Sequence, residues 1–274
     1  QLGAQATRAT RRLDNLTSPS GSYDETFDAV SPKLGLIWQT SPTDRVFANV
    51  SRSFEPAPFG EAPVRPLLPM PDAQEATSLE IGWKRDAGPV QLEATVYRAW
   101  IDRELLALTD NTGASIGTAN ADRTIHQGLE LGAVLPLSDD VSVRAVYLWN
   151  DFRFDGDANY GDGRIAGIAP HLLHAELEWR LTPWLALAPS VEWQPEGTWI
   201  DHANTVKTTG HTLLHLRAHG DLGEHVRWFA EVRNVTDRDY IAGTAVQANV
   251  RGLDGAYYFP GDPRSAYVGL SWRY

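Results

Sequence analysis

The strongest constraint on the fold of this sequence is an alternation of apolar and polar residues with a period of two, which recurs along the whole chain. Successive side chains of a β-strand point to opposite faces of its sheet, so this period predicts strands with one apolar and one polar face. The C-terminal end shows the pattern clearly, because one parity there holds Ala266, Val268, Leu270, Trp272 and Tyr274. Helical spacing is hard to find anywhere, and we therefore predict an all-β protein.

The connections between the predicted strands alternate between short and long. Short links join the strands in pairs, at 31–40 and 44–54, 77–85 and 89–101, 124–137 and 140–152, 169–181 and 184–194, and 209–220 and 225–234. Long polar segments separate these pairs, at 13–30, 55–76, 102–123, 153–168, 195–208 and 235–263. This asymmetry is typical of an outer-membrane barrel, which has tight periplasmic turns and long extracellular loops. A soluble β-sandwich also alternates, but it has no reason to keep its long loops at one end.

We predict one domain over residues 1–274, an antiparallel transmembrane β-barrel segment of about twelve strands. The sequence opens at Gln1 inside an alternating stretch, with no initiator Met and no signal peptide, so we expect a truncated or processed chain. Trp and Tyr gather near the strand ends, where amphipathic rings suit a membrane–water interface. These residues are Trp38, Trp83, Trp179, Trp184, Trp193, Trp272 and Tyr274.

Composition excludes several other classes of protein. The net charge of −11 argues against a nucleic-acid partner, because it leaves no chain-wide basic surface for phosphates. The absence of Cys excludes disulfides, thiol catalysis and Cys-ligated metals. No apolar run is long enough for a spanning helix, whereas a 42% hydrophobic content suits strands that face lipid with every second residue.

Six segments of the chain occur in the order of a known family. They are SPKLGLIWQTSPTDRVFANVSRSFEPAPFGE at 31–61, EATSLEIGWKR at 75–85, HQGLELGAVLPLSDDVSVRAVY at 126–147, GRIAGIAPHLLHAELEW at 163–179, NVTDRDY at 234–240 and PGDPRSAYVGLSWRY at 260–274. Together they resemble the C-terminal half of the TonB-dependent outer-membrane transporters, in particular the siderophore receptors. Within these motifs we expect Asn234, Asp237, Tyr240 and the terminal aromatic Tyr274 to have structural roles.

The resemblance implies the C-terminal part of a 22-stranded barrel in the outer membrane of a Gram-negative bacterium. The family's plug domain, TonB box and first strands are absent from this sequence, so the strand edges at Leu2–Arg12 and Ala266–Tyr274 are expected to pair with strands that are missing here. The implied function is energy-coupled uptake of a ferric siderophore or a similar scarce nutrient. It requires no catalysis and no cofactor.

The resemblance also implies the partners of the whole protein. They are outer-membrane lipid, the protein's own plug domain, the TonB complex acting through the missing N-terminal part, and the barrel-assembly machinery acting through the C-terminal strand. Two other classes stay open at this point. One is a self-contained twelve-stranded channel or phospholipase-like barrel, and the other is a soluble carbohydrate-binding β-protein.

Aromatic and basic residues in the predicted loops are the candidate ligand contacts. Ferric siderophores are bulky, often anionic and partly aromatic, so planar rings and guanidinium groups suit them. The candidates are Arg65, Trp199, His202, Arg251, Tyr257 and Tyr258. The alternative for each of them is that it simply packs the loops together.

Two sequence patterns suggest metal binding and are given another interpretation. His211, His215 and His219 are spaced four apart, but on a strand that spacing is about 13 Å, too far for two rings to share one zinc. The loop at 155–163 is acidic, yet it lacks the Gly and Glu of a calcium-binding EF-hand loop. We therefore predict no metal site, inward-facing histidines and a solvated acidic loop, with loop calcium as a minor alternative.

Charges of both signs alternate with the apolar residues of the strands, and we expect them to face the interior of the barrel. They are Glu80, Lys84, Glu130, Arg144, Glu176, Glu178, Arg180, Arg217, Arg227, Glu231 and Arg233. Nothing in the sequence singles out a catalytic pair among them.

Overall fold

The computed structural model describes residues 1–274 except 15, 17–21, 58–70, 110–113, 256 and 274. Twelve strands form one antiparallel sheet in chain order, which confirms the predicted fold class. The strands are β1 (Leu2–Leu13), β2 (Tyr23–Gln39), β3 (Asp44–Glu55), β4 (Gln74–Ala87), β5 (Val90–Asp102), β8 (Arg123–Pro136), β9 (Val141–Phe154), β10 (His171–Thr182), β11 (Leu185–Gln194), β12 (His211–Leu222), β13 (Val226–Arg233) and β16 (Ser265–Trp272).

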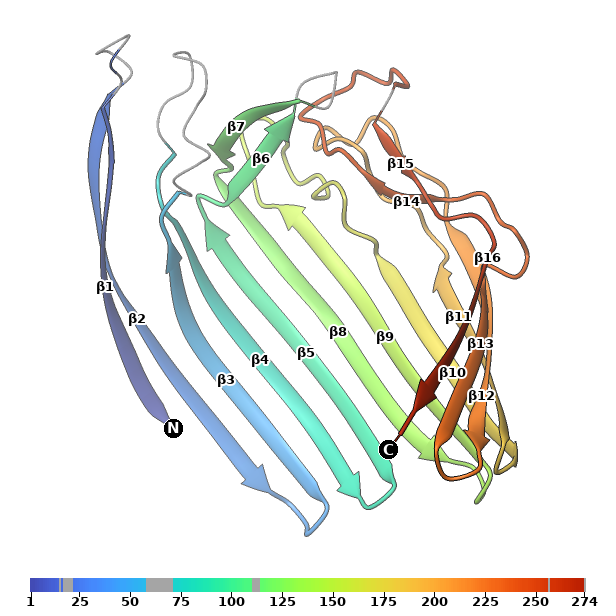
Figure 1. The fold of residues 1–274 in the computed structure, drawn as a ribbon. Coiled ribbons are helices and arrows are strands. Elements are labelled where there is room, and N and C mark those ends of the chain that lie inside the picture. The colour runs from blue at the N-terminus through green and yellow to red at the C-terminus, as the bar shows by residue number, and fades with distance from the viewer. Residues whose placement is uncertain (15, 17–21, 58–70, 110–113, 256, 274) are drawn as a thin grey trace.

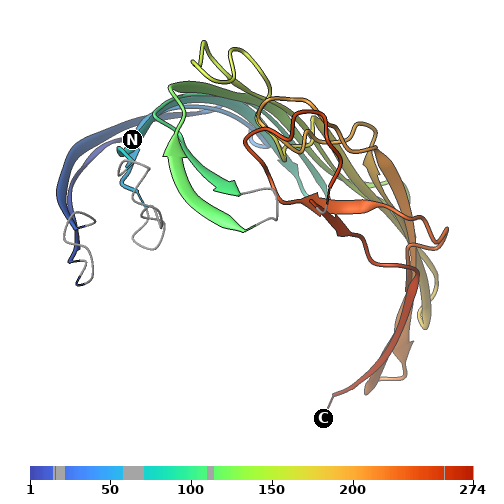
Figure 2. The same cartoon turned by 90° about the horizontal axis from the view of Figure 1, so that it is seen from above.

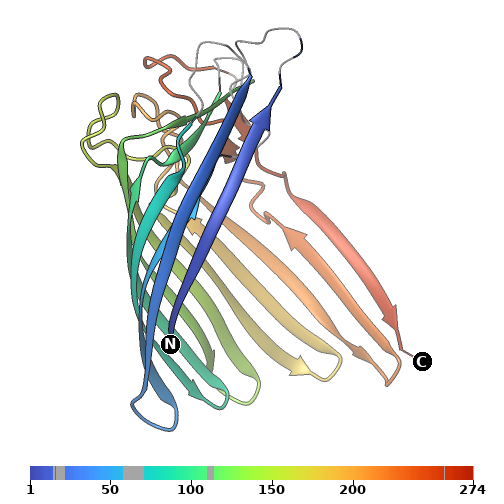
Figure 3. The ribbon, with the colours of Figure 1, turned by 90° about the vertical axis from the view of Figure 1, so that its left-hand side faces the viewer.

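The sheet curls into an open, curved wall (Figure 1). β1 and β16 lie at its two edges, far apart from each other when the wall is seen from above (Figure 2). The short connections all lie at one end of the wall, here called the turn end, and the long ones at the other, the loop end (Figure 3). The predicted alternation of short and long connections thus places all the long segments together.

No helix among the described residues is long and apolar enough to cross a membrane.

The pairing register separates the side chains into an outer, convex face and an inner, concave face. On the outer face, apolar residues line up across neighbouring strands, as in the row Leu36, Ala48, Ile81 and Val96. On the inner face, Arg144 lies opposite Glu176 and Arg217 opposite Glu231. The mixed charges predicted for the interior all have the parity of this inner face. The alternation in the sequence therefore corresponds to the two faces of the wall.

Three of the predicted long connections contain further strands. The segment 13–30 was expected to be a loop, and this expectation is wrong, because β2 begins at Tyr23 and pairs with β1 up to Leu13. The polar outer parity of 23–30, which includes Asp24 and Asp28, hides this strand from a search for apolar alternation. Two small hairpins, β6 (Leu105–Thr109) with β7 (Ser115–Asn120) and β14 (Ile241–Thr244) with β15 (Tyr258–Pro260), fold over the inside of the wall (Figure 2).

Candidate functional site

The long connections pack together into a layer at the loop end of the wall, with two small apolar clusters in it. One cluster is formed by Leu106, Ala121, Phe154 and Ile165. The other is formed by Ile200, Val250 and Tyr257. Both clusters join segments that are distant in the sequence. This loop layer contains five of the six predicted ligand contacts.

Asp201 is the polar centre of the loop layer and is fully buried, with 0% exposure. Its Oδ1 accepts hydrogen bonds from the amides of Thr205 at 2.8 Å and Val206 at 3.3 Å. Its Oδ2 accepts from the Thr205 hydroxyl at 2.6 Å and from the Val250 amide at 3.0 Å. A carboxylate with four donors holds the segment 201–206 against the connection between β14 and β15. The sequence analysis missed this residue, because nothing local distinguishes it from other loop aspartates.

His202 lies beside Asp201 and is only 3% exposed. Its Nδ1 accepts a hydrogen bond from the Ala166 amide at 3.3 Å. Its ring meets Phe154 edge-on, with centroids 5.5 Å apart, and lies 5.4 Å from the ring of Tyr160. Burial lowers the pKa of His202, so the neutral ring is favoured. The same burial raises the pKa of Tyr160.

The other predicted ligand contacts differ in how accessible they are. Tyr257 is 6% exposed within its apolar cluster. Tyr258 donates a hydrogen bond to Asp254 Oδ1 at 2.8 Å, and burial together with this bond raises its pKa to about 12. Trp199 is partly exposed, with the Lys207 ammonium 5.6 Å from its ring centre. Arg251 is exposed in a left-handed backbone conformation, with φ of 56°. Arg65 lies outside the described residues.

The family-motif residues form a turn that connects β13 to the C-terminal strands. Asn234 is buried at a φ of 48°, and its amide nitrogen donates to the carbonyls of Arg238 at 2.9 Å and Asp262 at 3.2 Å. Asp237 Oδ1 accepts from the Arg264 amide at 3.0 Å. These contacts bring the chain before β16 against the end of β13.

Tyr240 completes this turn by lying against Gly261, where a Cβ would approach the ring to 2.1 Å. Only glycine fits beside the ring at that position. Tyr274 lies outside the described residues.

The acidic loop after β9 was expected to be solvated. It is instead built around a buried aspartate. Asp157 Oδ1 accepts from the amides of Asn159 at 2.8 Å and Tyr160 at 3.0 Å, and Oδ2 accepts from the Asp122 amide at 2.9 Å. Its oxygens are therefore occupied by backbone donors. Within the described part of the chain, no group of three or more His, Asp or Glu side chains is arranged to hold a metal ion.

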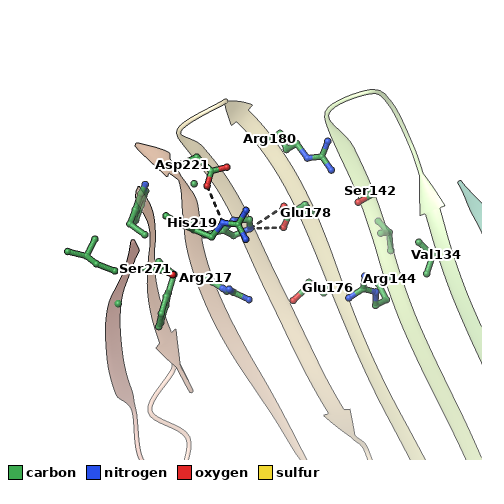
Figure 4. A pocket seen from close by; sticks show the side chains of 17 residues that line it. Val134, Ser142, Arg144, Glu176, Glu178, Arg180, Arg217, His219, Asp221 and Ser271 are labelled. Carbon is green, nitrogen blue, oxygen red and sulfur yellow. Dashed lines mark hydrogen bonds and ion pairs between the residues drawn. The ribbon is translucent and has the colours of Figure 1, made fainter. Parts of the chain in front are cut away.

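The inner face near the turn end carries a dense set of mixed charges, which we call the lower inner wall. A hollow of about 710 Å³ lies among Arg144, Glu178, Arg180 and their neighbours on β8 to β10, β12, β13 and β16 (Figure 4). His219 Nε2 lies 3.1 Å from both carboxylate oxygens of Glu178. Arg217 lines the same hollow, and further cations of this region are Arg45 on β3 and Lys84 on β4. This surface therefore carries both positively charged hydrogen-bond donors and negatively charged acceptors.

The inner face near the loop end has a different chemistry, and we call it the upper inner wall. It consists of inward-facing side chains on β3, β4, β5, β8, β9, β10, β11 and β12. In each strand, these side chains belong to the six residues nearest the loop end. Aromatic and imidazole rings gather here. His126 and Phe152 stack with centroids 4.1 Å apart, and Tyr97 meets Phe152 edge-on at 6.5 Å. Glu104, from the connection after β5, accepts hydrogen bonds from the Thr124 hydroxyl and, at 3.2 Å, from His126 Nε2.

A second hollow, of about 370 Å³, lies on the inner face at the loop end of β9 to β12. Val146, Leu148 and Leu172 give it an apolar surface. One signal in the sequence could have revealed this hollow. Apolar residues occur there at positions where the alternation otherwise places polar ones. His174 and Glu192 lie opposite each other across β10 and β11 at its rim.

The three evenly spaced histidines of β12 all face inward, as expected. His211 lies against the Tyr240 ring with centroids 4.8 Å apart. His215 Nδ1 accepts from the Asn234 amide at 3.2 Å, while its Nε2 lies 3.4 Å from Glu192. His219 pairs with Glu178. Each ring therefore has its own separate partner.

Comparison with known proteins adds the family context. A family model described as "TonB dependent receptor-like, beta-barrel" matches residues 1–235. The metal-pseudopaline receptor CntO of Pseudomonas aeruginosa is 24% identical over 269 residues, covering 96% of this chain and 36% of that protein. The ferrioxamine B receptor of Salmonella typhimurium is 24% identical over 286 residues, covering 100% of this chain and 38% of that protein. The chain thus spans little more than a third of the length of these curated relatives.

Similar solved structures include two that match over the whole chain. The siderophore receptor PiuA from Acinetobacter baumannii matches with a TM-score of 0.78 and 17% identity, and the match covers 40% of that receptor. The copper transporter OprC matches with a TM-score of 0.79 and 15% identity, and the match covers 44% of it. At these identities the comparison establishes the fold alone.

Proposed function

Because the chain belongs to the TonB-dependent receptor-like β-barrel family, we propose that it forms part of an outer-membrane transporter for a ferric siderophore or a similar metal chelate. The observation that carries this proposal is the curved sheet itself, with an apolar outer face, a polar inner face and two free edges at β1 and β16. Such a sheet serves as one part of a larger closed wall in lipid. Residues 1–274 act as a single wall domain.

The two inner regions suit different partners. The mixed charges of the lower inner wall fit a plug domain, which fills the barrel and hydrogen-bonds to its wall. The upper inner wall and the loop layer face the side from which a ligand arrives. TonB acts on the parts of the protein that precede these strands, and the barrel-assembly machinery engages the C-terminal strand.

The candidate ligand contacts divide by their exposure. Among the candidates, Arg251 is exposed and Trp199 is partly exposed, and we assign ligand contact to these two residues together with Arg65 and Tyr258. His202 and Tyr257 are buried, which supports a role in holding the loops in shape rather than in touching the ligand.

The alternative function is a self-contained twelve-stranded channel or phospholipase-like barrel. It requires β1 to pair with β16, and these strands lie at opposite edges of the sheet. The relatives named above are receptors and a transporter, which favours binding and transport over catalysis.

Uptake by the full-length protein tests the proposal. Iron-starved cells that lack their own siderophore receptors express the full-length protein. They are then supplied with iron-55 bound to each of a panel of chelators. We expect uptake of at least one chelate, and we expect it to stop when TonB is deleted or the proton gradient is collapsed. The proposal is contradicted if uptake persists without TonB, or if none of the chelates is taken up.

A further inference from the structure

Three hollows follow one another down the inner face of β10 to β12. The first is the hollow of about 370 Å³ at the loop end, and the last is the hollow of about 710 Å³ near the turn end. A third, of about 340 Å³, lies between them and shares His174 and Glu192 with the first. It shares Glu176 and Arg217 with the last. The three hollows together form one depression, here called the β11 groove, which joins the two ends of the wall.

The middle of the groove is deep because β11 carries small side chains between two strands with long ones. The inward residues of β11 on the turn side of Glu192 are Ser190, Ala188 and Ala186, and the first two line the middle hollow. The neighbouring strands point long side chains inward at the same levels. They are Glu176, Glu178 and Arg180 on β10, and His215, Arg217 and His219 on β12. β11 is thus the floor of the groove, and its two neighbours are the walls.

Small residues elsewhere on the inner face do not leave such a floor open. The ring of Phe47 on β3 lies over Gly82 on β4 and takes the space of the absent Cβ. Tyr97 on β5 covers Gly128 on β8 in the same way. At these two glycines a ring fills the place of the missing side chain, whereas no ring covers Ala188 or Ser190.

Charges of both signs line the groove along its length. Glu176 and Arg217 each line two of the hollows, and neither has an ion-pair partner in the part of the chain that the structure describes. β13 adds Glu231 and Arg233, joined by a hydrogen bond of 2.5 Å from Arg233 Nε to Glu231 Oε1. Mixed charges hold a polar solute weakly at many points. A conducting route requires this, because the solute must leave as well as enter.

One contact crosses the groove near the turn end. His219 Nε2 on β12 lies 3.1 Å from both carboxylate oxygens of Glu178 on β10, so this bridge passes over β11 (Figure 4). It lies at the level of Ala186, which is buried. Both side chains of the bridge are partly exposed, so separating them costs far less than breaking a buried ion pair. A solute that moves along the floor can therefore displace the bridge.

We infer that the β11 groove is the route by which the ligand passes along the wall from the loop end to the turn end once the plug is displaced. This inference rests on the proposed function and deepens it, because it assigns the route to residues of this chain. The upper mouth of the groove lies beneath the loop layer, where Tyr240 and Ala242 border it. Glu176 and Arg217 are the contacts midway, and the lower mouth opens among the mixed charges of the lower inner wall.

Single cysteines test the route, since the chain contains none of its own. Ser190→Cys places a thiol on the floor of the groove, and Ser78→Cys is the matched control. Ser78 also faces inward and is partly buried, but it lies on β4 and lines none of the three hollows. Both substitutions are made in the full-length protein, with any cysteine outside this chain replaced by serine.

Cells that express either variant receive iron-55 as a ferric trihydroxamate, a ferric tris-catecholate and ferric citrate, each in turn. Methanethiosulfonate reagents of increasing size are added while uptake is under way, and mass spectrometry confirms modification at both positions. With Ser190→Cys, we expect the largest reagent to slow uptake at least about fivefold, and smaller reagents less, because the adduct obstructs the route. The Kd for the same chelate at the cell surface should stay within about twofold, because capture takes place in the loops.

A reductant removes the adduct and should restore the rate, which excludes misfolding as the cause. Modification of Ser78→Cys is expected to change neither the rate nor the Kd. An unchanged rate at position 190 would show that the groove only packs against the plug, and it overturns the inference. An equal loss at position 78, or a weaker Kd in place of a slower rate, overturns it as well. In each case uptake by the unmodified variants keeps the proposed function intact, whereas the proposed function fails if the unsubstituted protein takes up none of the chelates.

Discussion

The wall and the loop layer of this molecule are held together in different ways. In the wall, backbone ladders satisfy the amides and carbonyls of the strands between the two edges, so individual side chains there are free to point outward or into the interior. In the loop layer, side chains accept hydrogen bonds from many of the backbone amides. Asp201 accepts four hydrogen bonds, and Asp157 accepts three from backbone amides.

This difference changes how a polar residue should be interpreted in each region. An inward charge in the wall is a group on the concave surface, and no backbone donor depends on it. A buried carboxylate or imidazole in the loop layer is a structural group, and its loss leaves backbone donors unpaired. His202 is the clearest example, because its residue type suggested ligand binding and its surroundings indicate packing.

The largest expected effect comes from Asp201→Ala in the full-length protein. It leaves the buried amide of Val250 and the partly buried amide of Val206 without this acceptor, and we expect a local loss of stability on the order of 3 kcal/mol. Hydrogen exchange measured by mass spectrometry should show faster exchange over 200–206 and 245–255. The exposed carboxylate Asp155 provides the control, and Asp155→Ala is expected to change exchange only at its own loop. Equal effects from the two substitutions would show that burial of the carboxylate is unimportant.

Asn234→Ala is expected to have the next largest effect, a loss of about 1–2 kcal/mol, because it removes side-chain bonds at a residue with left-handed backbone. Asn234→Gly separates the two causes, since glycine adopts that backbone freely but lacks the amide. Urea titration of the refolded protein measures both variants. If glycine restores full stability, the hydrogen bonds of Asn234 contribute nothing.

The pH dependence of the loop layer is a smaller effect. The pKa of His202 is lowered from its ordinary 6.5, so the unfolded ring gains its proton at a higher pH than the folded ring. The stabilising contribution of the neutral ring is therefore complete above pH 6.5 and declines as the pH falls below it. We expect exchange near Ala166, corrected for intrinsic rates, to rise several-fold between pH 7.5 and 5.5. His202→Gln should remove this dependence, and a profile that is unchanged in the variant would assign the effect to another group.

The smallest effect is expected in the wall itself. Ser190 lies on the inner face opposite His215, and Ser190→Ala leaves the backbone ladder of β11 intact. We expect a change of about 0.5 kcal/mol or less in the same urea titration. A loss as large as that of Asp201→Ala would remove the distinction between wall and loop layer.

Much of the wall could be predicted from the sequence. The alternation identified the face of each predicted inward charge, and the positions of the short links identified the turns. The prediction failed at 23–30, where the outer parity is polar and the pairing with β1 is the deciding contact. The candidate ligand residues were found by residue type alone, and residue type could not distinguish exposed Arg251 from buried Tyr257.

The sequence by itself determined the antiparallel strands, their two faces and the end of the wall that carries the long connections. These features depend on a period of two, which is local and repeats along the chain. Only the tertiary structure decided that Asp201 reaches Val250, that Thr109 donates a hydrogen bond to the carbonyl of Val246 at 2.6 Å, and that residues from five strands surround one hollow. Such contacts join residues far apart in the chain, and no local pattern encodes which distant partner a side chain will meet.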